Sequence, residues 1–243
     1  MTPRPNGSRP SRALPGIRGT LGSRPGRAAA EGMRRLNARH PWNHNHHFHA
    51  WILTRLPERR EAALDLGCGR GDLLALLAEE FTTVHGSDID ADMREAARRR
   101  TAGLPNVQVD QAALEEFPDS SLDLVTMVAV LHHLDIPAAL DRIRRVLAPG
   151  GKLLVVGLAP PATLTDHAWD VASMVTNPVI GLVKHPWPAP PDRPGPSIPI
   201  QDPTLTFDGL QEIATTALPG ARMRHHLGFR HTLEWTRPAG EHA

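Results

Sequence analysis

The chain has 243 residues, a length that can bury one substantial hydrophobic core. Its 27 basic and 26 acidic residues nearly cancel, which excludes a global field favouring nucleic acid or an anionic membrane surface. The one cysteine, Cys68, excludes an internal disulfide, and no apolar run reaches the roughly 18 residues of a membrane span. We therefore expect a soluble domain in the reducing cytoplasm, with no membrane partner.

The beginning of the chain differs in composition from the rest. Residues 1–39 hold nine Arg and one acid, Glu31, which leaves 18 basic and 25 acidic residues in the remainder. Residues 1–30 carry too little apolar area to offset the entropy of ordering them. We expect a disordered tail at 1–30, a lid and helix at 31–58, and the main domain at 59–243.

Helical and strand patterns alternate along the middle of the chain. Apolar residues from Phe48 to Leu56 fall at helical spacing, and Pro57 closes that helix. Strands separated by helices predict a parallel sheet covered on both faces. The predicted strands are 62–66, 82–87, 107–110, 122–128 and 152–157, and the predicted helices are 72–80, 91–100 and 137–147.

After Leu158 this alternation stops. Eight prolines fall between residues 186 and 203, and such a run cannot donate hydrogen bonds into a sheet. We expect residues 159–205 to form an insertion that covers the substrate, with Trp169 lining an apolar acceptor pocket. A helix at 207–218 and two strands at 221–226 and 230–235, joined by a turn at Gly228, are predicted to complete the chain.

The strongest chemical signal is a glycine loop between the first predicted strand and the next helix. Gly67 and Gly69 allow a tight turn and a close approach to a ligand, and Gly71 permits close packing of the helix. The spacing is Gly-x-Gly-x-Gly, which differs from the Gly-x-Gly-x-x-Gly of dinucleotide binding. The loop therefore predicts a ligand site of another kind.

An acid follows at the end of the second predicted strand. The Asp88 carboxylate can accept hydrogen bonds from both hydroxyls of a ribose. Asp90 is the alternative for this role, but its position suits an N-cap for the helix that begins near Ala91. We therefore prefer Asp88 as the ribose-binding residue.

Five segments together resemble the successive motifs of class I S-adenosylmethionine-dependent methyltransferases, in the order and at the spacing of that family. The resemblance implies an α/β, Rossmann-like, doubly wound seven-stranded sheet, mostly parallel with an antiparallel C-terminal strand. It also implies S-adenosylmethionine as the cofactor. The segments are Asp65–Gly71 (DLGCGRG), Gly86–Asp90 (GSDID), Leu122–Val125 (LDLV), Leu131–Leu134 (LHHL) and Leu147–Gly151 (LAPGG).

The same resemblance implies a set of cofactor-binding residues. The glycine loop meets the methionine part of the cofactor, and the acid at the second strand holds the ribose. For adenine the candidates are Asp110 or Gln111, with the backbone amide of Ala112 facing the ring. The set is Asp65, Gly67, Cys68, Gly69, Asp88, Ile89, Asp110, Gln111 and Ala112.

Two histidines after the fourth predicted strand are the candidates for proton transfer. Methyl transfer is a displacement in which alignment does much of the work, and a base is needed only for a protonated nucleophile. His132 or His133 can accept such a proton, although a structural or cofactor-facing role is the alternative. We expect in-line methyl transfer to an oxygen or nitrogen nucleophile of a small molecule. The alternatives are a rearrangement that uses the cofactor without transferring its methyl group, and a non-catalytic binding protein.

The histidine-rich segment before the first helix invites two interpretations. His40, His44 and His47 can share a helical face, but Pro41 and the lack of a carboxylate partner argue against a metal site, so none is expected. A lid over the cofactor and acceptor is the functional interpretation, and packing against the sheet edge is the alternative. The lid residues are Trp42, Asn43, His44 and Phe48.

Nucleic acid is not an expected partner. Enzymes of this type that methylate bases often carry an Asn/Asp-Pro-Pro-aromatic motif after the fourth strand, where this chain reads MVAV at 127–130. The Arg-rich tail alone would give only salt-sensitive attraction to phosphates. The sequence leaves the oligomeric state and the acceptor open.

Overall fold

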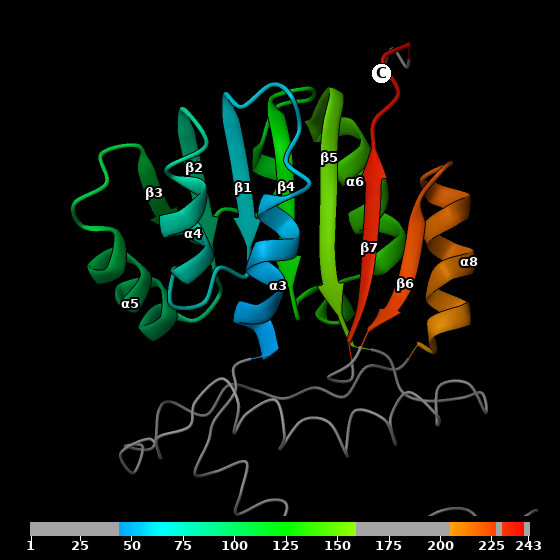
Figure 1. Ribbon diagram of the computed structural model, residues 1–243, viewed down its shortest axis with the longest axis horizontal. Coiled ribbons are helices and arrows are strands. Elements are labelled where there is room, and N and C mark those ends of the chain that lie inside the picture. The colour runs from blue at the N-terminus through cyan, green and yellow to red at the C-terminus, as the bar shows by residue number, and fades with distance from the viewer. Residues whose placement is uncertain (1–43, 159–204, 227–229, 241–243) are drawn as a thin grey trace, which may run out of the picture.

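A computed structural model of the chain describes residues 44–158, 205–226 and 230–240. The strands of these residues form one seven-stranded sheet with the order β3-β2-β1-β4-β5-β7-β6 (Figure 1). The strands are β1 (Ala62–Leu66), β2 (Thr83–Ser87), β3 (Val107–Asp110), β4 (Leu122–Val128), β5 (Leu147–Gly157), β6 (Arg222–His226) and β7 (Arg230–Thr236). The helices are α3 (His44–Leu53), α4 (Asp72–Leu77), α5 (Ala91–Thr101), α6 (Ile136–Val146) and α8 (Phe207–Ala217), with short 3₁₀ turns η1 (Leu114–Glu116) and η2 (Leu131–His133).

The direction of the strands confirms the predicted fold class. Strands β1 to β5 pair in parallel, whereas β7 is antiparallel to both of its neighbours, β5 and β6. The carboxyl ends of β1, β4 and β5 therefore lie at one edge of the sheet, the lower edge in Figure 1. Loops that follow these strands meet at that edge, where open α/β sheets bind their ligands.

Two hydrophobic clusters sandwich the sheet, one on each face. On the first face α3, α4 and α5 pack through Phe48, Ile52, Leu74 and Ala97 among others. On the second face α6, α8 and η1 pack against the alternate residues of the same strands. The alternation is visible in β5, where Leu154 and Val156 belong to the first cluster while Leu153 and Val155 belong to the second. A near-continuous apolar strand is what a sheet buried on both faces requires.

Most predicted boundaries agree with the structure within a few residues, and β1, β3 and β4 coincide with their predicted ranges. Two differ for identifiable reasons. Helix α4 ends at Leu77 because the N–H groups that follow donate to carbonyls three residues back instead of four, from Glu79 to Leu76 and from Glu80 to Leu77. Strand β5 begins five residues early, because Leu147 already pairs with Leu122 before the chain bulges and rejoins the ladder at Lys152.

Several predictions concern residues outside the described ranges. These are the tail at 1–30, residues 31–43 of the segment 31–58, the cover at 159–204 and the turn at Gly228. The helix predicted before Pro57 is present as α3. No helix in the described ranges is long and apolar enough to cross a membrane.

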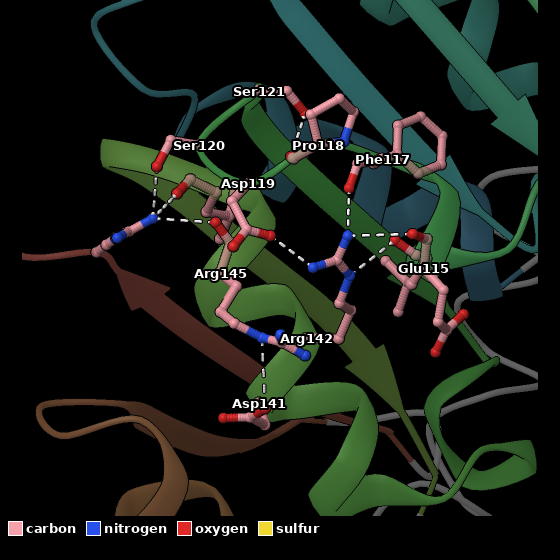
Figure 2. A network of polar contacts seen from close by, with 12 residues as sticks. Glu115, Phe117, Pro118, Asp119, Ser120, Ser121, Asp141, Arg142 and Arg145 are labelled. Atoms are coloured by element: carbon pink, nitrogen blue, oxygen red, sulfur yellow. Dashed lines mark hydrogen bonds and ion pairs between the residues drawn. The ribbon is translucent and has the colours of Figure 1, made fainter. Parts of the chain in front are cut away.

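Arg142 of α6 fastens the loop that leads into β4 (Figure 2). Its guanidinium donates to the backbone carbonyls of Leu114, Glu115 and Phe117, and it pairs with Asp119 at 2.6 Å. Only 13% of this side chain is exposed, so most of these bonds are shielded from water. The loop that sets the start of the central strand is held by Arg142, together with the Ser120 N–H bond to the Arg145 carbonyl and the Arg237 bond to the Ser120 hydroxyl.

We predict that Arg142→Ala lowers the free energy of unfolding by roughly 2 to 3 kcal/mol, because it leaves several carbonyls without a donor. The matched control is Arg145→Ala, which removes a half-exposed ion pair with Asp141 one turn along the same helix and should cost less than about 0.5 kcal/mol. Urea unfolding followed by circular dichroism measures both. Equal losses in the two variants would contradict this account.

Candidate active site

The glycine loop after β1 is tied to the end of β2 by its own backbone. The N–H groups of Gly67 and Cys68 donate to the Ser87 carbonyl at 2.7 and 3.0 Å. The next donor, Gly69 N–H, reaches the Asp88 carboxylate at 2.9 Å. The other carboxylate oxygen of Asp88 accepts from the Asp90 N–H, also at 2.9 Å. The structure therefore brings the predicted loop and the predicted acid into direct contact.

Each of the three loop glycines has a left-handed backbone, with φ of 71° at Gly67, 54° at Gly69 and 80° at Gly71. A Cβ at Gly67 would overlap a methyl group of Val130, and one at Gly71 would lie 3.0 Å from the backbone of Ala97 in α5. At Gly69 no atom lies within 4 Å of such a Cβ. The loop is therefore packed on both sides and open at its centre, where a ligand can approach the backbone.

Val130 reaches Gly67 through an unusual turn at the end of β4. Ala129 has a φ of 61°, a left-handed conformation that is uncommon for a residue with a Cβ. Its N–H donates to the Val156 carbonyl of β5 at 2.7 Å, which holds the turn in place. The segment carrying Val130 and the two candidate histidines is thereby fixed against the glycine loop.

Asp90 caps α5, as its position in the sequence predicts. Its carboxylate accepts from the N–H groups of Asp92 and Met93. Arg94 of the same helix donates to the Asp88 carbonyl at 2.8 Å. Asp90 is therefore used by the helix, while the Asp88 carboxylate points at the loop.

Asp65 is buried at the end of β1 beside the central strand. Its Oδ1 accepts a hydrogen bond of 2.7 Å from the Thr126 hydroxyl of β4. Burial raises the pKa of Asp65 to about 7; the Thr126 hydroxyl opposes this shift and the nearby Asp88 charge adds to it. A carboxylate that titrates near neutrality inside a loop site is a feature of functional sites more than of packing.

Cys68 is buried in the cluster between the loop and α4. Burial, with the nearby Asp65 and Asp88 charges, raises the pKa of its thiol far above the usual value. The thiol therefore stays protonated and unreactive at neutral pH. Its side chain fills space, and only its backbone lies along the loop.

The three candidates for adenine differ in how they are engaged. The Asp110 carboxylate already binds His85 at 2.7 Å, and it accepts from the Ala112 N–H at 2.8 Å and from Gln108. The Ala112 amide, expected to face the adenine ring, is thus turned toward Asp110. Gln111 is exposed between them. Asp110 shapes the loop after β3, which leaves the Gln111 side chain available at its surface.

Ile89 follows Asp88 and is 85% exposed, the one large hydrophobic residue so exposed in the described part of the chain. An isoleucine at the edge of a sheet normally packs against something. Its place beside the Asp88 carboxylate offers an apolar surface next to a polar one, as a nucleoside requires.

The two candidate histidines lie in η2, directly after Val130, with ring centroids 4.0 Å apart. His132 is partly buried, and burial, His133 and Arg230 all lower its pKa, so the ring is neutral at pH 7. Its Nδ1 is buried and has no hydrogen-bond partner among the residues that the structure describes. His133 is exposed.

A small cavity of about 20 Å³ lies beside His132, at the carboxyl ends of β4 and β5. Its wall includes His231 of β7, a residue that the sequence did not single out. An alternating strand pattern does not show whether a buried histidine lines a cavity or is packed on all sides. Thr126, the partner of Asp65, was also missed, because the pattern does not show which residues of neighbouring strands are in contact.

Of the predicted lid residues, the structure describes the side chain of Phe48, and the lid itself stays a prediction. Phe48 is buried between α3 and the sheet, and its ring meets His226 edge-on at 5.3 Å. This burial agrees with the alternative interpretation, in which the segment packs against the sheet. Trp42, Asn43, Trp169 and the side chain of His44 lie outside the described residues. Within the ranges that are described, no group of three metal-ligating side chains gathers.

The strand order, with a glycine loop after β1 and an acid at the tip of β2, defines the class I methyltransferase fold. A S-adenosylmethionine-dependent methyltransferase from Aquifex aeolicus has a similar structure, with a TM-score of 0.53 and 16% identity, covering 85% of this chain and 97% of that one. Residues 64–155 match the methyltransferase domain family. An uncharacterized methyltransferase of Mycobacterium tuberculosis is 33% identical over 201 residues, which cover 82% of this chain and 98% of that protein. The chain therefore belongs to the class I S-adenosylmethionine-dependent methyltransferases, enzymes with S-adenosylmethionine as methyl donor.

Two further relatives match less than half of the chain. A demethylmenaquinone methyltransferase of Symbiobacterium thermophilum is 37% identical over 107 residues, which are 40% of this chain and 43% of that protein. A nocamycin O-methyltransferase of Saccharothrix syringae is 39% identical over 114 residues, which are 43% of this chain and 40% of that protein.

We predict that Gly67→Ala destabilises the protein by roughly 2 kcal/mol or more and weakens S-adenosylmethionine binding, because its Cβ must displace Val130. The matched control is Gly69→Ala, which adds only the cost of a left-handed alanine, about 1 kcal/mol. Thermal unfolding and calorimetric titration measure the two effects. A Gly67→Ala protein as stable as Gly69→Ala would show that Val130 does not pack as described.

Proposed function

We propose that this enzyme transfers the methyl group of S-adenosylmethionine to an oxygen or nitrogen atom of a small-molecule acceptor. The observation that carries the proposal is the position of His132. Its unpartnered Nδ1 lies in the segment that packs on the glycine loop, and its ring lines a cavity on the side away from β2 and β3. The relatives named for nocamycin and demethylmenaquinone support a small acceptor.

The cofactor fits the residues at the edge of the sheet. Asp65 is suited to the ammonium of its methionine part, because a buried carboxylate favours a cationic partner. Asp88 is suited to the ribose hydroxyls, since each carboxylate oxygen keeps a lone pair beyond the backbone N–H it accepts. Exposed Ile89 offers an apolar surface for adenine, and Gln111 offers an amide for its polar edge.

The chemistry supplied by the cofactor is a methyl group on a positively charged sulfur, ready for in-line displacement. The chain's own task is to place the acceptor atom behind that methyl group and to exclude water. Where the acceptor arrives protonated, His132 accepts the proton, because its ring is neutral at pH 7 and its Nδ1 has no other partner. His133 is exposed and is the second candidate.

We predict that the purified enzyme forms S-adenosylhomocysteine when a panel of hydroxyl- and amine-bearing metabolites is supplied with S-adenosylmethionine. Asp88→Ala should weaken S-adenosylhomocysteine binding about 100-fold, because two hydrogen bonds to a charged group are lost. Asp90→Ala is the matched control: it should cost about 1 kcal/mol of stability through the lost cap and leave affinity within about twofold. Mass spectrometry and calorimetry make the measurements. Cofactor binding without product from any acceptor would contradict the function, and unchanged affinity in Asp88→Ala would contradict the site.

The pH dependence of cofactor affinity provides a separate test, because a protonated Asp65 cannot pair with an ammonium. With its pKa near 7, the ionised fraction of this carboxyl falls about tenfold between pH 8 and pH 6, so Kd should rise about tenfold. Calorimetry at pH 6 in two buffers of different ionisation enthalpy should show about one proton released on binding. Flat affinity over this range would contradict the role of Asp65.

The matched control is Asp65→Asn, which should bind weakly with no such pH dependence. A carboxyl whose pKa is raised in the folded state contributes stability at low pH that is lost as the pH rises through 7. Asp65→Asn should therefore have a higher Tm than the wild type at pH 8, by a margin that shrinks toward pH 5.

A further inference from the structure

His231 of β7 is almost fully buried, with 2% of its surface exposed, and its Nε2 has no hydrogen-bond partner in the described part of the chain. A buried polar nitrogen without a partner costs free energy, so its presence calls for a physical reason. The proposed cofactor site does not use it. Its surroundings point to a ligand.

The ring is held in a fixed position. In the strand register His231 lies opposite Gly157 of β5, and a Cβ at that glycine would overlap the imidazole. Phe207 of α8 packs against the ring at 5.9 Å, at an angle of 81°. The absence of a side chain at Gly157 thus makes room for the imidazole at the end of β5.

His231 and His132 line the same cavity, and each has a buried ring nitrogen without a partner. The cavity of about 20 Å³ has room for one water molecule or one hydroxyl group. The rest of its wall is largely apolar and suits a carbon skeleton next to that hydroxyl: Leu131, Ile136, Leu158, Leu205 and Leu210.

Among the described residues, the titratable groups that act on His231, besides burial itself, are basic: His225, Arg230, His132 and His226. Arg230 keeps its positive charge at any physiological pH. An ammonium group would be repelled here, whereas an oxygen that carries or develops negative charge would be attracted. The cavity therefore discriminates between the two acceptor atoms that the proposed function leaves open.

We propose that this cavity binds the reacting hydroxyl of a phenolic or enolic acceptor, with the His231 Nε2–H donating a hydrogen bond to the acceptor oxygen and His132 Nδ1 receiving its proton. This inference rests on the proposed function and selects oxygen over nitrogen.

The step balances with the methyl donor as the only co-reactant. The acceptor oxygen forms a bond to the methyl carbon as the carbon–sulfur bond breaks, and the electron pair of that bond stays on sulfur. The hydroxyl proton passes to His132. His231 remains neutral throughout and acts as a donor, which agrees with burial and its basic neighbours lowering its pKa to about 3.

The test uses the full chain saturated with S-adenosylhomocysteine and three probes that share a ring. They are 4-nitrophenol, 4-nitroanisole, in which the hydroxyl is blocked, and 4-nitrobenzylamine, which is an ammonium ion at pH 7. Absorbance titrations measure affinity and the apparent pKa of bound nitrophenol. We expect nitrophenol to bind at least tenfold more tightly than the other two, with its pKa lowered by the basic cluster.

Substitutions then assign the effect to His231. His231→Leu should weaken nitrophenol binding at least tenfold, leave nitroanisole within about twofold and abolish the pKa shift. His231→Gln, which keeps an N–H donor, should recover most of the affinity. His226→Gln is the control for the direct hydrogen bond, since His226 bonds Thr232 and is not among the residues that line the cavity; it should leave nitrophenol affinity within about threefold.

Equal affinities for the three probes, tighter binding of the amine, or an unaffected His231→Leu variant would overturn the inference. If His231→Leu lowered Tm and weakened the binding of all three probes equally, His231 would have a purely structural role, and this result would overturn the inference too. Failure of S-adenosylhomocysteine to bind would instead overturn the proposed function on which the inference rests. Cofactor binding without discrimination among the probes would leave that function standing.

Discussion

Three successive backbone N–H groups of the glycine loop, at Gly67, Cys68 and Gly69, donate to the last residues of β2. This contact turns the chain sharply after β1 and sets the start of α4. It also orients the Asp88 carboxylate toward the loop, and α5 keeps that end of β2 in place through Arg94 and the Asp90 cap. Because Gly67 has no Cβ, the segment after β4 can pack against the same loop.

The carboxyl edge of the sheet is consequently divided between two kinds of chemistry. Acidic groups lie at the ends of β1, β2 and β3: Asp65 near the end of β1, Asp88 directly after β2 and Asp110 as the last residue of β3. Basic groups follow β4 and begin β7, where His132 and His231 line a small cavity and Arg230 precedes His231. A cationic methyl donor suits the first half and an oxygen nucleophile suits the second. Val130, which packs against Gly67, directly precedes the η2 segment that carries His132.

Much of the fold could be predicted from sequence because the local signals were strong and agreed. Alternation of apolar strands with helices gave β1, β3 and β4 their exact ranges, and the loop and Asp88 followed from residue chemistry at strand ends. Contacts between side chains of different strands could not be predicted in the same way. The Thr126 hydroxyl that bonds Asp65 and the His85 ring that bonds Asp110 both come from strands distant in sequence. Helical periodicity beginning at Phe48 agrees with the burial of that residue, whereas its proposed part in a lid stays a prediction.

The central claim is that the Asp88 carboxylate and the glycine loop form one cofactor site. The most direct test is a crystal structure of the protein with S-adenosylhomocysteine. Both ribose hydroxyls should lie within about 3.2 Å of the Asp88 carboxylate, with the adenine against Ile89 and the ammonium against Asp65. A ribose bound elsewhere, with the Asp88 oxygens still contacting only Gly69 and Asp90, would contradict the account.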